Sequence, residues 1–201
     1  VPENEHATMA SGIDIPEIQL IPIAEISGLP SEASIFGGQT ALAVRRFDRP
    51  APGKRVHIED FAQILGLYPE QKYASYNYET LANLVSKLAG ESELNEFIRR
   101  LVFVIASGNG DAHLKNFGLI YSDPTSDDCR LSPLFDVVNT TAYHPKDTLA
   151  LKLGGTKAWP ATKDLIEFGK IHCRVDHPEQ IIERIATTAT AYRPPEHSGI
   201  W

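Results

Sequence analysis

Cysteine is scarce in this sequence, with only Cys129 and Cys173 among its 201 residues. Two cysteines are too few for a disulfide scaffold, and their separation is not that of metal ligands. We therefore interpret both as ordinary reduced thiols.

An excess of positive charge is also absent. The chain has 26 acidic residues against 19 lysines and arginines, which gives a formal net charge of −7. Such a chain lacks the broad basic field with which proteins neutralise nucleic-acid phosphates. Direct binding of nucleic acid is therefore disfavoured, except at a local basic patch.

Long apolar runs are missing as well. No stretch approaches the ~20 residues needed to span a bilayer, and no signal peptide is recognisable. We therefore expect no membrane partner and a cytoplasmic location. The chain begins at Val1 rather than Met, which is consistent with an absent upstream part. At 42% hydrophobic, it can bury a core as one domain or as one domain and a part.

The apolar periodicity predicts strands early in the chain and helices later. The predicted strands are 13–23, 40–46, 117–121 and 149–153, and the predicted helices are 3–11, 56–65, 79–88, 94–106, 161–173 and 178–192. This order indicates a mixed α+β fold with a helical lobe. The tyrosine-rich stretch 68–78 is interpreted as packing or surface residues, because no basic groove accompanies it.

The most informative stretch runs from Leu101 to Asp136. An apolar run leads into a turn at Gly108, Asn109 and Gly110, which would present Asp111 at the mouth of a cleft. Asn116 follows five residues later, an offset that favours a loop with converging polar tips. Asp136 comes after the apolar pair Leu134-Phe135. Two carboxylates and an amide that converge on one cleft suit a hard cation such as magnesium.

An aspartate and an asparagine separated by four residues, with a later aspartate, are the arrangement of phosphoryl transfer in protein kinases. The short pattern alone is weak, and the alternative is a solvated loop with an Asx turn. The context favours phosphoryl transfer, because the apolar approach, the glycine-rich turn and the following strand occur together.

The sequence resembles the HipA family of bacterial serine/threonine kinases, the toxins of HipBA-type toxin–antitoxin pairs. Five ordered segments carry this resemblance and cover nearly the whole chain. They are Asn4-Glu5-His6 with 12–16, 42–49, 59–63 with Lys72-Tyr73, Gly110-Asp111-Ala112-His113-Leu114-Lys115-Asn116-Phe117, and Leu131-Ser132-Pro133-Leu134-Phe135-Asp136-Val137.

The resemblance implies a protein-kinase-like fold and a role for each polar residue of the loop. Asp111 would be the catalytic base, and Asn116 and Asp136 would bind Mg²⁺. His113 and Lys115 would lie beside the phosphates of ATP, with Lys115 offsetting charge on the transferred group. The alternatives are that His113 only caps the loop and that Lys115 is a surface cation.

The resemblance also implies a hinge between two lobes at residues 45–48. Backbone groups of Arg45 and Phe47 would bind the adenine edge, and Asp48 would accept a hydrogen bond from a ribose hydroxyl. The same residues are equally typical of a strand followed by a salt-bridged turn.

Part of the family pattern is missing. Upstream of the 3–11 helix, complete members carry a phosphate-covering loop and a strand lysine, and neither is found here. The glycine pair at 37–38 leads into the hinge strand and is better interpreted as a β-turn. We therefore expect residues 1–48 to be a remnant of the N-terminal lobe with the hinge, and residues 49–201 to be the helical C-terminal lobe with the catalytic loop. Without the phosphate clamp, ATP should bind weakly and react slowly.

Three functions remain open at this point. The first is a serine/threonine protein kinase with a protein substrate and a helix-turn-helix antitoxin of the HipB type, through which alone it would contact DNA. The second is a non-catalytic, kinase-like module that binds an antitoxin or another partner. The third is a small-molecule or lipid kinase, which the 47–49 and 131–134 segments argue against.

Overall fold

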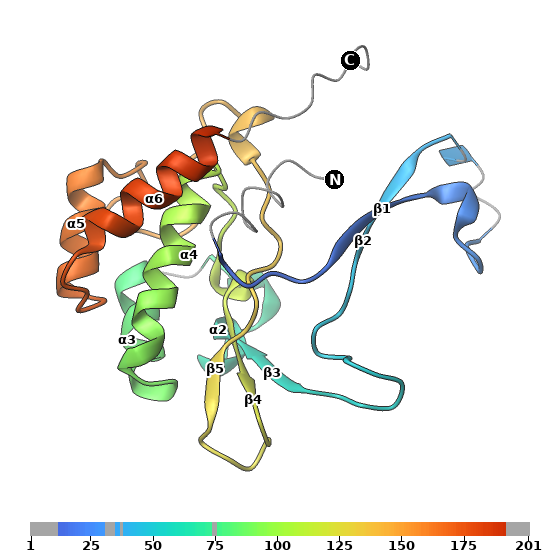
Figure 1. Ribbon diagram of the computed structural model, residues 1–201, viewed down its shortest axis with the longest axis horizontal. Helices are drawn as coiled ribbons and strands as arrows, with labels where there is room; N and C mark the ends of the chain where they lie inside the picture. The colour runs from blue at the N-terminus through green and yellow to red at the C-terminus, as the bar shows by residue number, and fades with distance from the viewer. Residues whose placement is uncertain (1–11, 31–34, 37, 74–75, 192–201) are drawn as a thin grey trace.

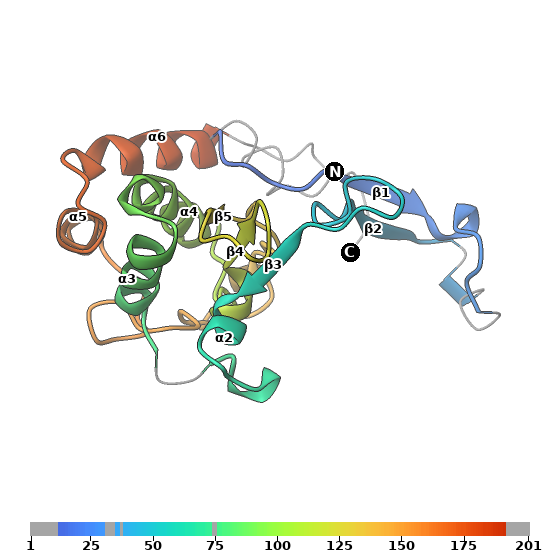
Figure 2. The ribbon, with the colours of Figure 1, turned by 90° about the horizontal axis from the view of Figure 1, so that it is seen from below.

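The computed structural model describes residues 12–30, 35 and 36, 38–73 and 76–191. Helices and a small sheet form the body of the molecule, and a hairpin of two strands extends away from it, as Figure 1 and Figure 2 show from two directions. The predicted helix 3–11 lies outside the described residues.

Four helices dominate the body: α3 (Tyr78–Leu88), α4 (Leu94–Ala106), α5 (Thr162–Ile171) and α6 (Pro178–Ala191). They confirm the four later helices predicted from periodicity. Helix α4 is central, because it packs against both α3 and α6 and carries an apolar stripe from Leu94 to Val104 that is almost fully buried. Helix α3 begins at the N-cap Asn77, whose side-chain oxygen accepts a hydrogen bond from the Thr80 amide.

The body sheet has three antiparallel strands in the order β3 (His57–Asp60), β4 (Gly118–Tyr121) and β5 (Cys129–Leu131). The prediction of one helix over residues 56–65 is therefore wrong. Residues 57–60 pair with β4, and a helix, α2 (Phe61–Ile64), begins only after Asp60. Asp60 and Gln63 form a capping box that fixes this start.

The projecting hairpin consists of β1 (Ile18–Pro22) and β2 (Thr40–Val44), paired antiparallel from Ile18 opposite Val44 to Pro22 opposite Thr40. Several of its apolar side chains are exposed, including those of Leu20, Leu42 and Val44. The hairpin supports the predicted early strands, although β1 is shorter than the 13–23 segment. The predicted division after residue 48 stays a prediction.

Residues 149–153 do not form the predicted strand. Leu149, Leu151 and Leu153 are buried in the core, but only isolated bridges join Lys152 to Asn77 and Leu153 to Thr156. Their apolar character therefore reflects burial of an irregular segment, not pairing in a sheet.

Short 3-10 turns connect these elements: η1 (Ile23–Glu25), η3 (Pro69–Gln71), η4 (Glu91–Glu93), η5 (Leu114–Asn116) and η6 (Thr140–Ala142). Among the described helices, none combines the length and the apolar character that crossing a membrane requires.

Candidate active site

The loop that carries the predicted catalytic residues joins the end of α4 to the start of β4. Helix α4 stops at Ala106, and Gly108 follows with a φ of 66°. The amides of Gly108 and Asn109 donate to the carbonyls of Ile105 and Val104, so the chain turns sharply at the end of the helix. Asp111 therefore lies five residues after the end of a buried helix.

Gly110 allows the segment after η6 to approach this loop closely. Its amide donates to Thr140 Oγ1 at 2.8 Å, and Thr140 Oγ1 in turn donates to Asp147 Oδ2 at 2.5 Å. A Cβ atom at position 110 would overlap the Asp147 carboxylate and lie 2.6 Å from the Thr148 carbonyl oxygen. The loop and the 140–148 segment thus pack backbone against backbone.

Replacement of Gly110 by alanine is expected to lower the free energy of unfolding by about 1–3 kcal/mol, the usual result of overpacking. Urea unfolding followed by circular dichroism measures this change. Gly38→Ala is the matched control, because among the described residues no atom lies within 4 Å of a Cβ added there. An equal and small effect for both variants would contradict the packing argument.

The segment from His113 to Asn116 is a capped 3-10 turn. His113 Nδ1 accepts from the Lys115 amide at 3.3 Å, and the His113 amide donates to Asn116 Oδ1 at 3.0 Å. His113 therefore does cap the loop, as one of the two interpretations held. Burial of the imidazole and the nearby charge of Lys72 lower the pKa of His113. Both effects favour the neutral ring near neutral pH, and because Nδ1 accepts, the neutral ring carries its proton on Nε2.

Asn116 and Asp136 meet although 20 residues separate them. Asn116 Nδ2 donates to Asp136 Oδ2 at 2.7 Å, and Asn109 Nδ2 lies 3.4 Å from the Asp136 carbonyl oxygen. Asp136 has a φ of 59°, a left-handed conformation that is uncommon outside glycine and suggests a functional constraint. Asn116 is buried and the Asp136 side chain is exposed, so a cation could reach this pair from solvent.

Asp111 lies close to Asn109, Tyr73 and His113. Its amide donates to Asn109 Oδ1 at 3.0 Å, the hydroxyl of Tyr73 donates to Asp111 Oδ1, and His113 Nε2 lies 4.0 Å from Asp111 Oδ2. The Asp111 side chain is 48% exposed, which leaves room for a further hydroxyl. Lys115, four residues further along the chain, is half-buried.

The predicted hinge is attached to this site through an aromatic contact. The rings of Phe47 and Phe135 lie 5.8 Å apart, so Phe47 packs beside the residue that precedes Asp136. The amide of Arg45 is already used, because it donates to the Glu17 carbonyl at 2.8 Å as an extension of the β1–β2 pairing.

Asp48 is buried and lies between two arginines. Arg46 binds both of its carboxylate oxygens at 2.8 and 2.6 Å, and Arg49 binds Oδ2 at 2.7 Å. The hydrogen bonds from Arg46 lower the pKa of Asp48. The salt-bridged turn is therefore present. The ribose contact of Asp48 stays a prediction, and the arginines already occupy much of the acceptor capacity of this carboxylate.

The donor set fits magnesium better than a soft metal. Within the described ranges, no three His, Cys, Asp or Glu side chains form a metal cluster. Magnesium instead is commonly held by one or two protein oxygen ligands together with substrate phosphates. Asn116 Oδ1, which accepts one hydrogen bond and retains a second lone pair, and the exposed Asp136 carboxylate supply hard oxygen ligands of this kind.

Four polar residues that support the site were not predicted from sequence. Tyr73 was noted only within a tyrosine-rich stretch and a family segment, and Asn109 only as part of a turn. Thr140 and Asp147 carry no pattern that would connect them to the loop, because their contacts with it span about thirty residues or more of chain.

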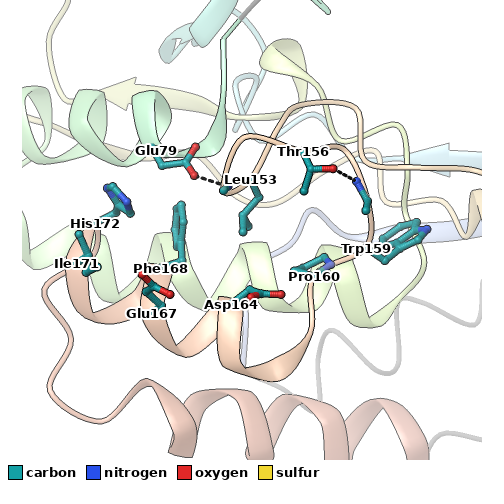
Figure 3. Close-up of a pocket in the computed structure, with 12 residues that line it drawn as sticks. Glu79, Leu153, Thr156, Trp159, Pro160, Asp164, Glu167, Phe168, Ile171 and His172 are labelled. Carbon is teal, nitrogen blue, oxygen red and sulfur yellow. Dashed lines mark hydrogen bonds between the residues drawn. The ribbon is translucent and has the colours of Figure 1, made fainter.

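A separate cavity of about 400 Å³ lies between α5 and the 153–160 segment (Figure 3). It contains none of the predicted site residues. Its wall includes Trp159, whose indole Nε1 donates to the Asp147 carbonyl at 2.8 Å. The cavity and the catalytic loop therefore share Asp147 as a structural neighbour.

Comparisons with known proteins identify the family of the chain. The family of HipA-like C-terminal domains matches residues 1–192. Putative kinase Y4dM of Sinorhizobium fredii is 42% identical over 188 residues, which cover 90% of this chain and 44% of that protein. Putative kinase Y4mE of the same bacterium is 35% identical over 137 residues, which cover 62% of this chain and 31% of that protein. The chain thus spans less than half the length of these two relatives.

Two solved structures share the fold. The HipA chain from the Shewanella oneidensis MR-1 complex of HipA, HipB and operator DNA matches 98% of this chain and 50% of its own, with a TM-score of 0.74 and 19% identity. The Helicobacter pylori proinflammatory kinase CtkA matches 94% of this chain and 79% of its own, with a TM-score of 0.54 and 15% identity. The predicted α+β, kinase-like fold is therefore confirmed.

Proposed function

This chain belongs to the family of HipA-like C-terminal domains, and from that premise we propose that it forms the hinge and catalytic lobe of a serine/threonine protein kinase. The reaction would transfer the γ-phosphate of ATP to a protein hydroxyl. The observation that carries the proposal is the hydrogen bond between Asn116 and Asp136, beside a loop that presents the half-exposed Asp111. The kinase names of the relatives support the same class of chemistry.

Asp111 is proposed as the base that accepts the proton of the attacking hydroxyl. A base must lie within hydrogen-bonding reach of that hydroxyl. One carboxylate oxygen already accepts from Tyr73, and the half-exposed side chain can accept another hydrogen bond. Asp111 would thus orient the acceptor as well as take its proton.

Asn116 and Asp136 are proposed to hold Mg²⁺ through their side-chain oxygens. When bound, the ion would offset the negative charge of the phosphates. The 2.7 Å hydrogen bond between the two side chains fixes their relative position, and the Asn109 amide group near the Asp136 carbonyl steadies the backbone. The pair is therefore organised before a ligand arrives, which reduces the cost of binding.

His113 and Lys115 are proposed to face the phosphates. The neutral His113 can donate from Nε2, and Lys115 can contribute a positive charge where negative charge develops. At the hinge, the Arg45 carbonyl and the Phe47 backbone remain the proposed contacts of adenine, and Asp48 that of the ribose.

The proposed partners are a protein substrate and a helix-turn-helix antitoxin of the HipB type, with DNA contacted only through that antitoxin. The Shewanella complex, which contains HipA, HipB and operator DNA, supports this proposal by its shared fold. Because this chain covers half of that HipA chain, we propose that the phosphate clamp belongs to the other half of such a protein.

Magnesium-dependent binding tests the proposal directly. In the complete gene product, Asp136→Asn is expected to weaken Mg²⁺-dependent ATP binding at least about tenfold, because one charged ligand becomes neutral. Asparagine tolerates the left-handed conformation of position 136, so the variant removes charge without adding backbone strain. Isothermal titration calorimetry with and without Mg²⁺ provides the measurement.

Asp127→Asn is the matched control, because Asp127 is an exposed carboxylate in the β4–β5 connection. Equal affinities of the two variants and the unmodified protein would contradict the assigned metal ligands. Failure of the unmodified protein to bind ATP with Mg²⁺ would contradict the kinase proposal and favour a non-catalytic binding module.

A further inference from the structure

Tyr73 contacts the proposed base Asp111, but the proposed mechanism gives Tyr73 no role. Its hydroxyl donates a hydrogen bond to Asp111 Oδ1, across 38 residues of sequence. Its ring meets the imidazole of His113 edge-on, with centroids 5.2 Å apart and an interplanar angle of 76°. The proposed base and the neighbouring histidine are thus contacted by one aromatic side chain.

The surrounding contacts give Tyr73 a defined position. The Leu114 amide donates to the Lys72 carbonyl at 3.3 Å, which ties the chain just before Tyr73 to the catalytic loop. The Lys72 ammonium lies 4.9 Å from the centroid of the Tyr73 ring, within cation–π range. His113, against which the ring packs, is itself buried and fixed by the Lys115 amide.

The hydroxyl acts as a donor and not as a second base. Burial, followed by the hydrogen bond and charge of Asp111, raises the pKa of Tyr73 to about 12. The phenol is therefore protonated near neutral pH, and its hydrogen bond to the Asp111 carboxylate is charge-assisted.

Without the hydrogen bond from Tyr73, the carboxylate of Asp111 would be free to rotate. Its side chain is 48% exposed, and a second polar group near it, His113 Nε2, is 4.0 Å from Oδ2, beyond direct hydrogen-bonding distance. Among the residues that the structure describes, Tyr73 is thus the side chain that hydrogen-bonds to this carboxylate, and it does so at Oδ1 and not at Oδ2.

We infer that Tyr73 is a positioning residue for the base: it holds Asp111 Oδ1 so that Oδ2 faces the acceptor hydroxyl. This inference rests on the proposed kinase function. Tyr73 touches neither the acceptor nor the nucleotide in this role, so its contribution lies in the rate of transfer and not in the binding of ATP.

The test is Tyr73→Phe in the complete gene product, with steady-state kinetics of phosphoryl transfer to a protein acceptor. Phenylalanine keeps the ring contacts with His113 and Lys72 and removes only the hydrogen bond. We expect kcat to fall about tenfold to a hundredfold, the size of effect that a misplaced catalytic group produces. The KM for ATP, the Kd for Mg²⁺-ATP and the melting temperature should remain those of the unmodified protein.

Tyr68→Phe is the matched control, because Tyr68 lies in the same tyrosine-rich stretch with its side chain 75% exposed. An unchanged kcat for Tyr73→Phe would overturn the inference, and a raised kcat would overturn it by showing that the phenol competes with the acceptor. A loss of kcat matched by losses in ATP affinity and melting temperature would also overturn it, in favour of a structural role. Two further results separate the two levels: if Asp111→Asn still transfers phosphate at the normal rate, Asp111 is not the base, and if the unmodified protein transfers none, the kinase assignment itself fails.

Discussion

Replacement of Asp111 by asparagine is expected to abolish phosphoryl transfer, with a loss of at least about a thousandfold in kcat. General base catalysis contributes about 10²–10⁴ in rate, and this side chain is also expected to orient the acceptor. Asparagine has nearly the same shape, and its carbonyl oxygen can still accept the hydrogen bond of Tyr73. The variant therefore removes the proton acceptor and leaves the loop intact.

Transfer of labelled phosphate from ATP, followed by identification of the phosphorylated amino acid, measures this loss in the complete gene product. Calorimetry should show that Mg²⁺-dependent ATP binding persists, because Asn116 and Asp136 are unchanged. Asp123→Asn is a suitable control, since Asp123 lies in the exposed turn after β4. Phosphoserine or phosphothreonine formed at the normal rate by Asp111→Asn would contradict the assignment of the base.

Replacement of Phe97 by alanine is expected to lower the free energy of unfolding by about 3–5 kcal/mol. Phe97 lies in α4 with no exposed surface, and its ring centroid is 5.7 Å from that of Phe117, the residue that follows Asn116. The variant would leave a cavity beneath the exit of the catalytic loop. A loss of this size is a large part of the 5–15 kcal/mol that typically stabilises a domain.

Urea unfolding measures the effect of the Phe97 variant. Phe97→Leu should recover much of the lost stability, because leucine refills part of the cavity. Phe36→Ala removes a ring that is 45% exposed and should change the free energy of unfolding by no more than about 0.5 kcal/mol. A similar small effect at position 97 would contradict the central place of α4 in the core.

The helical lobe could be predicted from sequence because its helices are long and strongly periodic. Helix α4 is the clearest case, since its apolar positions lie along one broad buried stripe. Residues 56–65 were misassigned because β3 and α2 are only four residues each and together mimic one helix. Residues 149–153 were misassigned because a buried segment without a paired strand can have the same apolar composition as a strand.

The candidate site was predictable only where its polar residues lie near each other in sequence or follow a known motif. Asn116 and Asp136 do meet as their chemistry suggested. At the hinge, the sequence was equally compatible with a nucleotide contact and with a salt-bridged turn. The structure contains the salt-bridged turn, in which Arg46 and Arg49 both bind Asp48. Tyr73 and Thr140 escaped prediction, because a hydrogen bond between distant residues depends on packing that no local pattern encodes.

The contacts that close the catalytic loop also set when it can form during folding. Gly110 reaches Thr140 across 30 residues, Asn116 reaches Asp136 across 20, and Tyr73 reaches Asp111 across 38. Contacts between distant residues form slowly, because the entropy of closing long loops is lost before they contribute stability. The helices, whose backbone hydrogen bonds are local, should therefore become protected first in pulsed hydrogen exchange, and the catalytic loop should gain protection last. A newly made chain would then form its helices before the loop that carries the proposed base is in place.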